Sequence, residues 1–297
     1  MNGRKERKAD YAIVWPLQAP LGEGPMWDAR TGRLYFVDII PGRLHAYEPA
    51  TGARRTWEVG RMLSAVVPRT AGGLAVVVRE GFATYDPDQS RLDFLTTPAG
   101  HDPSRVRFND GKCDPAGRFW AGTMGLKAEP GAGALYCLPP GGPAQWKVGD
   151  VTISNGLAWR DRRLYYIDSI TRLVRAFDYE PATGAISRPV TALVLPPGDD
   201  VPDGCSLDAE GMLWIAHWGA GKVSRWDPVR GRCLQEYRFP ASQITSCAFG
   251  GPGLKTLYVT SAREGLAPEQ LAREPEAGAL FAFEPGPVGL EPDAFAG

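Results

Sequence analysis

Six oxygen-bearing side chains recur along the chain at a similar distance from a repeated apolar residue. Each lies nine to eleven residues before a large apolar residue within a short β-type segment. If the repeats are related by rotation about one axis, these side chains converge near that axis. Two carboxylates and two amides in a narrow channel need a cation, and oxygen ligands suit Ca²⁺, Mg²⁺, Mn²⁺ or a similar divalent ion. The six residues are Glu23, Ser64, Asn109, Asn155, Asp203 and Ser246.

Glycines beside the acids and amides support this interpretation. Glu23, Asn155 and Asp203 are each followed directly by glycine, and Gly111 lies two residues after Asn109. Glycine lets the backbone turn or approach closely beside a bound ion. Any one Asn-Gly or Asp-Gly pair is more simply a turn at the start of a strand. Four occurrences in the same phase of the repeat favour a site.

The segments that follow the second strand of each repeat are expected to surround the mouth of the channel. The long segments after Thr123 and Ser261 are the natural lids. Arg107, two residues before Asn109, shares its strand face and is placed to reach a substrate oxygen. The candidates on this rim are Lys127, Asp168, Ser169, His217, Trp218, Arg263 and Glu264.

Several rim candidates also have a simpler structural interpretation. Arg263 and Glu264 are more simply a solvated surface pair. His217 is equally well a hydrogen-bonded rim histidine without a chemical role. Asp168 either supports the ligands through hydrogen bonds or ends a strand as a turn residue. The sequence alone leaves these alternatives open.

The element that positions these residues is a short apolar strand that occurs six times. Its anchor residues lie 40 to 49 residues apart, the length of a four-stranded propeller blade. Each copy follows a turn signal and precedes a second alternating strand, and no stretch has a sustained helical period. Because one blade cannot bury both of its faces, the pattern predicts an all-β, six-bladed β-propeller as a single domain over residues 11–297. The anchors are Leu34, Leu74, Phe119, Leu164, Leu213 and Leu257.

The two ends of the chain complete the predicted ring. Residues 1–10 form a basic N-terminal extension without the apolar stretch of a secretory signal. The segment Tyr11–Pro16 has no partner of its own, and the last repeat lacks a good fourth strand. We therefore expect Tyr11–Pro16 to pair with the last blade and close the ring, so that no edge strand stays exposed.

Composition and charge argue against several classes of function. The 297 residues carry a net charge of −1, which predicts neither a nucleic-acid partner nor an anionic membrane. The longest purely apolar run has about five residues, far below the roughly 18 of a membrane span. Five dispersed cysteines without a C-x-x-C pair predict free thiols and a cytoplasmic location. Because the motifs of serine hydrolases, zinc proteases and phosphate loops are absent, hydrolysis would depend on the metal ion.

Several short motifs are more specific than the repeat itself. They are Leu21-Gly-Glu-Gly-Pro25, Arg107-Phe-Asn-Asp-Gly-Lys112, Asp114-Pro-Ala-Gly117, Ala121-Gly-Thr-Met124, Ile153-Ser-Asn-Gly156, Tyr166-Ile-Asp168 and Pro202-Asp-Gly204. These motifs resemble the gluconolactonase, or regucalcin (senescence marker protein), family of six-bladed propellers. The resemblance covers nearly the whole chain, and residues 198–204 and 249–258 are similar to bacterial pentonolactonases of this family.

The resemblance implies a metal site and a set of residue roles. In the family a glutamate, an asparagine and an aspartate hold one divalent ion, and they correspond to Glu23, Asn155 and Asp203. The resemblance also implies that Asp203 is the general base and that Arg107 and Asn109 contact the substrate. The ion is Ca²⁺, Zn²⁺, Mn²⁺, Mg²⁺ or Fe²⁺, and the sequence does not select among them.

Lys127 departs from the family pattern. It occupies about the position of a substrate-binding glutamate of animal members, so we expect a substrate contact of opposite charge here. The predicted function is metal-dependent hydrolysis of small sugar lactones, such as glucono- or pentonolactones, to aldonic acids. The alternatives are a non-enzymatic calcium-binding regulator and a phosphotriesterase-type hydrolase on the same scaffold. We expect a monomer or weak dimer, and the sugar and its ring size stay open.

Overall fold

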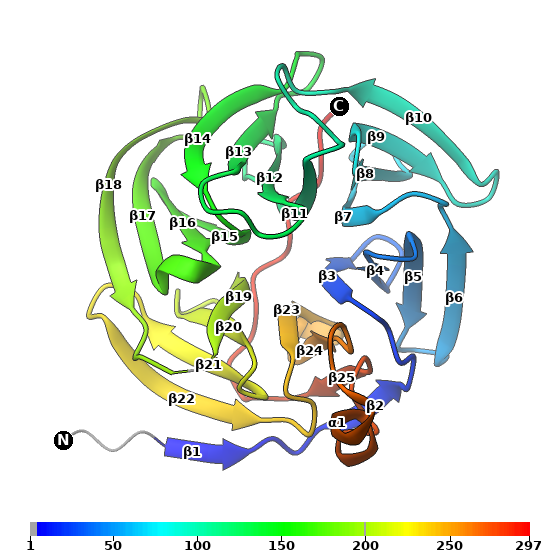
Figure 1. Ribbon diagram of the computed structural model, residues 1–297, viewed down its shortest axis with the longest axis vertical. Helices are drawn as coiled ribbons and strands as arrows, with labels where there is room; N and C mark the ends of the chain where they lie inside the picture. The colour runs from blue at the N-terminus through cyan, green and yellow to red at the C-terminus, as the bar shows by residue number, and fades with distance from the viewer. Residues whose placement is uncertain (1–4, 199) are drawn as a thin grey trace.

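The computed structural model describes residues 5–198 and 200–297. Six sheets stand around a central axis, and neighbouring strands within each four-stranded blade pair antiparallel (Figure 1). In four blades the strands follow one another along the chain from the innermost to the outermost. In the other two blades a strand from the N-terminal end of the chain forms the outer edge. This arrangement confirms the predicted six-bladed propeller.

The first three blades follow one another along the chain. Blade one comprises β3 (Gly22–Asp28), β4 (Arg33–Asp38), β5 (Arg43–Glu48) and β6 (Ala53–Glu58). Blade two comprises β7 (Leu63–Pro68), β8 (Leu74–Val78), β9 (Gly81–Asp86) and β10 (Arg91–Thr96). Blade three comprises β11 (Val106–Cys113), β12 (Phe119–Gly125), β13 (Gly133–Leu138) and β14 (Gln145–Val151).

The remaining blades include the two N-terminal strands. Blade four comprises β15 (Ser154–Arg160), β16 (Arg163–Asp168), β17 (Leu173–Glu180) and β18 (Ala185–Val194). Blade five comprises β19 (Val201–Leu207), β20 (Leu213–Trp218), β21 (Lys222–Asp227), β22 (Arg232–Arg238) and β1 (Lys5–Lys8). Blade six comprises β23 (Ile244–Gly250), β24 (Thr256–Ser261), β25 (Leu280–Phe283) and β2 (Ala12–Trp15). The short helices are η1 (Ser169–Thr171), η2 (Pro252–Leu254) and α1 (Pro268–Arg273).

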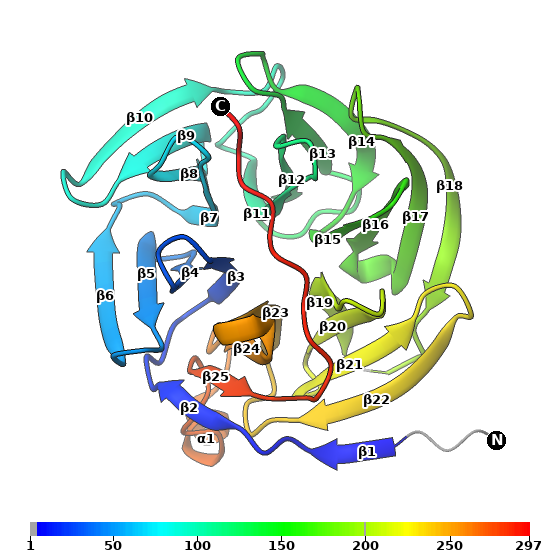
Figure 2. The same ribbon diagram turned by 180° about the vertical axis from the view of Figure 1, so that it is seen from behind.

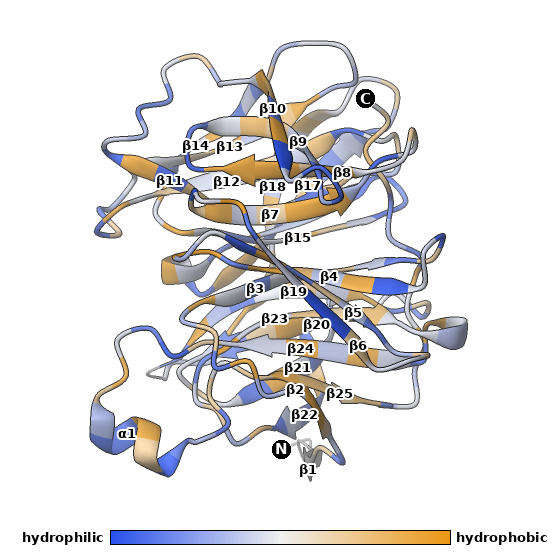
Figure 3. Cartoon of the chain, turned by 90° about the vertical axis from the view of Figure 1, so that its right-hand side faces the viewer, coloured by the Kyte–Doolittle hydropathy of each residue, from blue (hydrophilic) through white to orange (hydrophobic). Residues whose placement is uncertain are grey.

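Burial explains why the apolar repeat marks the inner part of each blade. Both faces of an inner strand pack against neighbouring blades, and every residue of β7 and β8 is buried. The outermost strands face solvent, and β6 is almost entirely exposed and polar. Figure 3 shows this contrast as a largely hydrophobic β7 beside a hydrophilic stretch in β6. The core therefore consists of layers between blades, which hold the inner strands rigidly around the channel.

The N-terminal segment closes the ring as expected. β2 pairs antiparallel with β25, with Ala12 opposite Ala282 and Trp15 opposite Leu280. The edge of Trp15 also packs on the ring of Phe36 in blade one. The first and last blades are thus joined by a strand from the start of the chain.

The predicted basic extension is partly integrated into the propeller. Residues 5–8 form β1, which pairs in parallel with β22, and residues 1–4 lie outside the described residues. β22 would otherwise present an open strand edge, and β1 covers it with backbone hydrogen bonds. β1 therefore adds a fifth strand at the outer edge of blade five.

The C-terminal residues 286–297, here called the C-terminal strap, cross the centre of the ring on the face seen in Figure 2. The amide of Gly289 donates to the carbonyl of Leu254 at 2.8 Å, and the amide of Phe295 donates to the carbonyl of Pro68 at 2.8 Å. The strap therefore bridges blade six and blade two, which are not neighbours in the ring.

Two further sequence predictions concern cysteines and membranes. Cys113, Cys137, Cys205 and Cys247 are free thiols, and all four are buried. Within residues 5–198 and 200–297, no helix is long and apolar enough to span a membrane.

Candidate active site

A β-bulge interrupts each of the six inner strands near its predicted channel residue. The pairing register shifts between Glu23 and Met26 in β3 and between Phe108 and Gly111 in β11. Equivalent shifts occur in β7, β15, β19 and β23. A bulge frees one residue from the ladder and turns side chains away from the pleat. This repeated irregularity aims polar side chains toward the axis of the ring.

A cavity of about 360 Å³ lies at the mouth of the channel. It brings together the three predicted metal ligands and two of the predicted substrate contacts. Its wall also contains an apolar collar of five residues, Met124, Ile153, Ile170, Val201 and Trp218. The other lining residues are Leu21, Glu23, Arg107, Asn109, Asn155, Ser169, Asp203 and Glu264.

The two amides of the site are oriented by hydrogen bonds. Asn109 donates from Nδ2 to the carbonyl of Ser154 at 2.9 Å and to Oδ1 of Asn155 at 3.2 Å. Asn155 donates from Nδ2 to Oγ of Ser169 at 2.8 Å. Arg107 donates to Oδ1 of Asn109 at 2.7 Å. The amide oxygen of Asn155 is thus turned toward the channel, where it has lone-pair capacity for a cation.

The two carboxylates of the site are buried without adequate compensation. Glu23 and Asp203 are 5% and 4% exposed, and Oδ1 of Asp203 has no hydrogen-bond partner. Burial, and then the nearby Asp110 carboxylate, raise the pKa of Glu23 to about 8. Burial, followed by repulsion from Glu23 and Asp110, also raises the pKa of Asp203. Buried acids that repel each other fit a site that holds a cation between them.

The oxygen atoms available at the site also suit a metal ion. The described residues contain no cluster of three or more His, Cys, Asp or Glu side chains placed to hold a metal. An ion here would therefore take Glu23 and Asp203 together with the amide oxygen of Asn155. Two carboxylates and one neutral oxygen form a hard, doubly negative site, which suits a divalent cation.

Asp110 is a buried channel residue that the sequence interpretation missed. Its carboxylate accepts a hydrogen bond from the amide of Gly111 at 2.7 Å and is 6% exposed. The equivalent positions in three other blades are glycines, including Gly156 and Gly204. A Cβ at Gly156 would lie 2.9 Å from the carbonyl of Asp203, so a side chain does not fit there. The position directly after each predicted channel residue would have been the signal, since only blade three carries an acid there.

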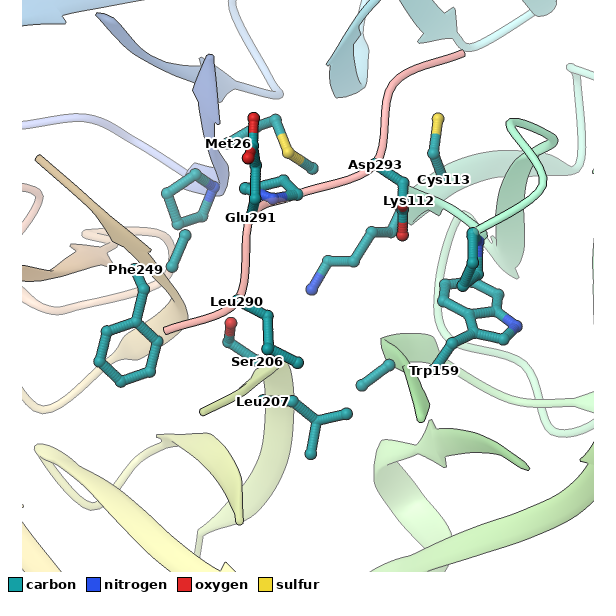
Figure 4. A pocket seen from close by; sticks show the side chains of 15 residues that line it. Met26, Lys112, Cys113, Trp159, Ser206, Leu207, Phe249, Leu290, Glu291 and Asp293 are labelled. Atoms are coloured by element: carbon teal, nitrogen blue, oxygen red, sulfur yellow. The ribbon is translucent and has the colours of Figure 1, made fainter. Parts of the chain in front are cut away.

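A second cavity of about 300 Å³ occupies the other end of the channel, under the C-terminal strap. Lys112 points into it, beside strap residues Leu290 and Asp293 (Figure 4). The Lys112 ammonium group donates to the carbonyl of Cys205 at 2.7 Å. Burial raises the pKa of the Asp110 carboxyl, and the positive charge of Lys112 opposes this rise. The two ends of the channel therefore differ in charge. The end with Glu23 and Asp203 is acidic, and the end under the C-terminal strap contains Lys112.

The structure differs from the prediction for Lys127. Lys127 is exposed and lines a neighbouring groove with Arg105 and Glu129, outside the site cavity. The loop after β12 turns sharply, with the amide of Ala128 donating to the carbonyl of Gly125 at 2.9 Å. This turn directs Lys127 away from the channel mouth.

The other rim candidates divide into two groups. Ser169, Trp218 and Glu264 line the cavity. Asp168 accepts hydrogen bonds from the amides of Thr152 and Ile153, so it shapes the backbone that leads to Asn155. This contact favours the supporting role for Asp168 over that of a simple turn residue.

His217 and Arg263 make their contacts away from the cavity. His217 is held between Oδ2 of Asp200 at 2.7 Å and Oγ of Ser224 at 2.6 Å. Ser224 is fully buried, so this Asp-His-Ser arrangement has no exposed nucleophile. Arg263 donates to the Gln18 side chain at 2.6 Å and does not pair with Glu264.

Comparison with known proteins identifies the family. Residues 21–263 match the family model described as SMP-30/Gluconolactonase/LRE-like region. The chain belongs to this family. It is 37% identical over 290 residues to the Bacillus subtilis protein named "Putative sugar lactone lactonase YvrE", covering 97% of this chain and 99% of that protein. It is 38% identical over 292 residues to human regucalcin, covering 96% and 97% of the two chains.

Solved structures agree with this membership. A calcium-binding protein, regucalcin, from Agrobacterium tumefaciens superposes with a TM-score of 0.94 at 27% identity, covering 99% of both chains. A gluconolactonase from Xanthomonas campestris superposes with a TM-score of 0.73 at 21% identity, covering 93% of this chain and 89% of that one. At that identity the second likeness supports the fold alone.

Proposed function

We propose that this protein is a divalent-metal-dependent lactonase that hydrolyses small sugar lactones to aldonic acids. The observation that carries the proposal is the buried Asp203 carboxylate, whose Oδ1 lacks a partner beside Glu23 in the channel cavity. The name of the Bacillus subtilis relative, "Putative sugar lactone lactonase YvrE", supports the lactone as substrate.

Glu23, Asn155 and Asp203 are the residues that would hold the ion. When bound, a divalent cation supplies a Lewis acid that polarises a lactone carbonyl and favours ionisation of water. Asp203 is the proposed general base, since its Oδ1 is placed in the cavity without a competing donor. It would take a proton from water as the water oxygen bonds to the carbonyl carbon. The ring C–O bond then breaks, and the proton held by Asp203 would pass to the leaving oxygen to give a hydroxyl.

Arg107 and Asn109 are the proposed substrate-positioning residues. The guanidinium of Arg107 is fixed by the carbonyl of Phe108 at 2.9 Å and by Oδ1 of Asn109 at 2.7 Å. Its remaining N–H groups are available to sugar oxygens in the cavity. A side chain already held in place loses little entropy when substrate binds, which favours productive orientation.

The apolar collar limits what can enter. Trp218 and Ile170 add apolar surface to a cavity that is otherwise lined by polar side chains such as Arg107. The cavity volume of about 360 Å³ suits a single sugar ring. Sugar rings have apolar C–H faces as well as hydroxyl edges. The combination therefore favours a small cyclic ester over a polymer or a peptide.

A second candidate function uses the same residues without catalysis. Several relatives are named regucalcin, and the Agrobacterium tumefaciens structure is described as a calcium-binding protein. A protein of this kind would bind Ca²⁺ at Glu23, Asn155 and Asp203 and leave lactones unchanged. Lactone hydrolysis separates the two functions directly.

The test combines metal analysis with a substrate panel. Protein purified without chelator is analysed for its metal content and assayed on aldonolactones with a pH indicator, because each turnover releases a proton. Asp203→Asn should lose the bound metal and lower turnover by at least about 100-fold, since it removes a ligand charge and the base. Asp161→Asn is the control, because Asp161 is an exposed turn residue. Metal-loaded Asp203→Asn protein with most of its turnover would contradict the assigned roles.

A further inference from the structure

Glu264 stands at the rim of the cavity on a backbone that is fixed from two sides. It follows β24, and the neighbouring Ala262 forms a bridge with Leu21. The amide of Glu264 donates to the carbonyl of Pro20 at 3.0 Å. Its carbonyl accepts from Nε2 of the buried Gln243 at 2.8 Å. The start of the side chain is therefore set by the fold and is not free to move with a loop.

The carboxylate of Glu264 has no direct partner among the described residues, although its charge acts across the cavity. Burial lowers the pKa of Arg107, and Glu264 makes the largest opposing electrostatic contribution, ahead of Glu23 and Asp203. Glu264 is exposed, whereas those two acids are buried. Arg107 therefore shares the cavity with, and is acted on by, two buried acids and one exposed acid.

The other charged side chains near the mouth do not neutralise Glu264. Arg263 turns outward to Gln18, and Lys127 lies in the neighbouring groove, where its amide bonds to the Glu129 carboxylate. Among the described residues that line the cavity, Glu264 is the only exposed charged one. A ligand that enters the cavity therefore meets a negative charge first.

We propose that Glu264 is a charge filter that makes the site select uncharged lactones over anionic ones and weakens binding of the acid product. This inference rests on the proposed lactonase function. Hydrolysis adds water across the ester bond of a neutral lactone and gives a hydroxy acid. A carboxylic acid of pKa about 3.5 loses its proton at neutral pH, so substrate and product differ by one negative charge. A fixed carboxylate at the rim repels the product and leaves the neutral substrate almost unaffected.

The experiment compares Glu264→Gln with Glu269→Gln, an exposed acid of α1 that lies outside the cavity lining. Glucono-1,5-lactone is the neutral probe, 6-phosphogluconolactone the anionic probe and gluconate the product probe. In Glu264→Gln, the ratio of kcat/KM for the anionic over the neutral lactone should rise about two- to fivefold at an ionic strength of about 0.01 M. Gluconate should bind more tightly by a similar factor, measured by calorimetry. Both changes should largely disappear at about 1 M salt, and Glu269→Gln should show neither.

The outcomes separate this inference from the proposed function. Wild-type protein without lactone turnover would refute the lactonase, while the gluconate titration would still test the filter. Equal changes for charged and neutral probes, changes that persist at high salt, or gluconate affinity that is unaltered or undetectable in both proteins would each overturn the charge filter.

Discussion

The Asp203 carboxylate combines two properties that folded proteins seldom leave together, namely burial and a missing hydrogen-bond partner. Such a group costs free energy unless something else compensates it. The charge of Arg107 and the amide of Gly204 offset only part of this cost, because Glu23 and Asp110 add negative charge. At the scale of single residues, this imbalance is the strongest physical argument for a bound cation.

Substitution of Arg107 and of Lys127 tests directly which of these two positively charged side chains contacts the substrate. Arg107→Lys should lower kcat/KM for a neutral lactone by about tenfold or more, because an ammonium lacks the planar fork that holds some donors on Phe108 and Asn109 while others face the ligand. Lys127→Ala should change kcat/KM by less than about twofold, because Lys127 is exposed outside the cavity. Steady-state kinetics of both variants measure this difference. A large rise in KM for Lys127→Ala would instead mean that its loop closes over the bound substrate.

At the scale of elements, the joint between β2 and blade one contains a titratable group. His45 of β5 stacks on Phe36 with ring centres 4.8 Å apart and meets the edge of Trp15 from β2 at 5.3 Å. Its Nδ1 lies 2.9 Å from Oγ1 of Thr56, and its Nε2 has no partner. Burial, and then the positive charge of Arg43, lower the pKa of His45 to about 4.

Acid should therefore weaken this joint. Between pH 6.5 and 4 the unfolded chain binds the His45 proton more readily than the folded chain does, so stability falls as the pH falls through this window. The contribution is fully present above pH 6.5 and amounts to at most about 3 kcal/mol. Urea unfolding of wild type and His45→Gln across this range measures the effect, since other titrating groups cancel in the difference. Parallel stability curves for the two proteins would refute it.

At the level of secondary-structure elements, the sequence predicts the inner strands, the channel residues and the closure of the ring. The predicted anchors Leu34, Leu164 and Leu257 lie in β4, β16 and β24, because each marks a short apolar run that the blade buries. The channel residues follow from rotation of one repeat, which needs no knowledge of loops. Ring closure by β2 follows from the missing fourth strand of the last blade.

The missed features share a different physical origin. Strict alternation places Asp110 on the opposite face from Asn109, but the bulge in β11 brings Asp110 into electrostatic contact with Glu23 and Asp203. The sequence of β1 lacks any apolar pattern, so periodicity does not mark it as a strand. The direction of Lys127 depends on one tight turn, which side-chain periodicity does not encode.

At the scale of the whole molecule, the two ends of the channel are built differently. The end with Glu23 and Asp203 opens through the cavity with the apolar collar, whereas the C-terminal strap crosses the other end (Figures 2 and 4). Ligands should therefore enter and leave on the side of Glu264. The strap is anchored by Phe295, which is 2% exposed and packs near Phe119 between blades two and three.

Phe295 should consequently contribute to global stability although only two residues follow it in the sequence. Phe295→Ala should lower the free energy of unfolding by about 2–4 kcal/mol, the cost of a buried aromatic ring reduced by relaxation of a terminal segment. Leu290→Ala is the matched control on the same strap, and its half-exposed side chain should contribute less than about 1 kcal/mol. Urea unfolding with an unchanged m-value gives both numbers. A single buried anchor predicts that Phe295→Ala loses clearly more free energy of unfolding than Leu290→Ala does. Equal losses for the two variants would mean that the strap stabilises the protein by covering the channel as a whole.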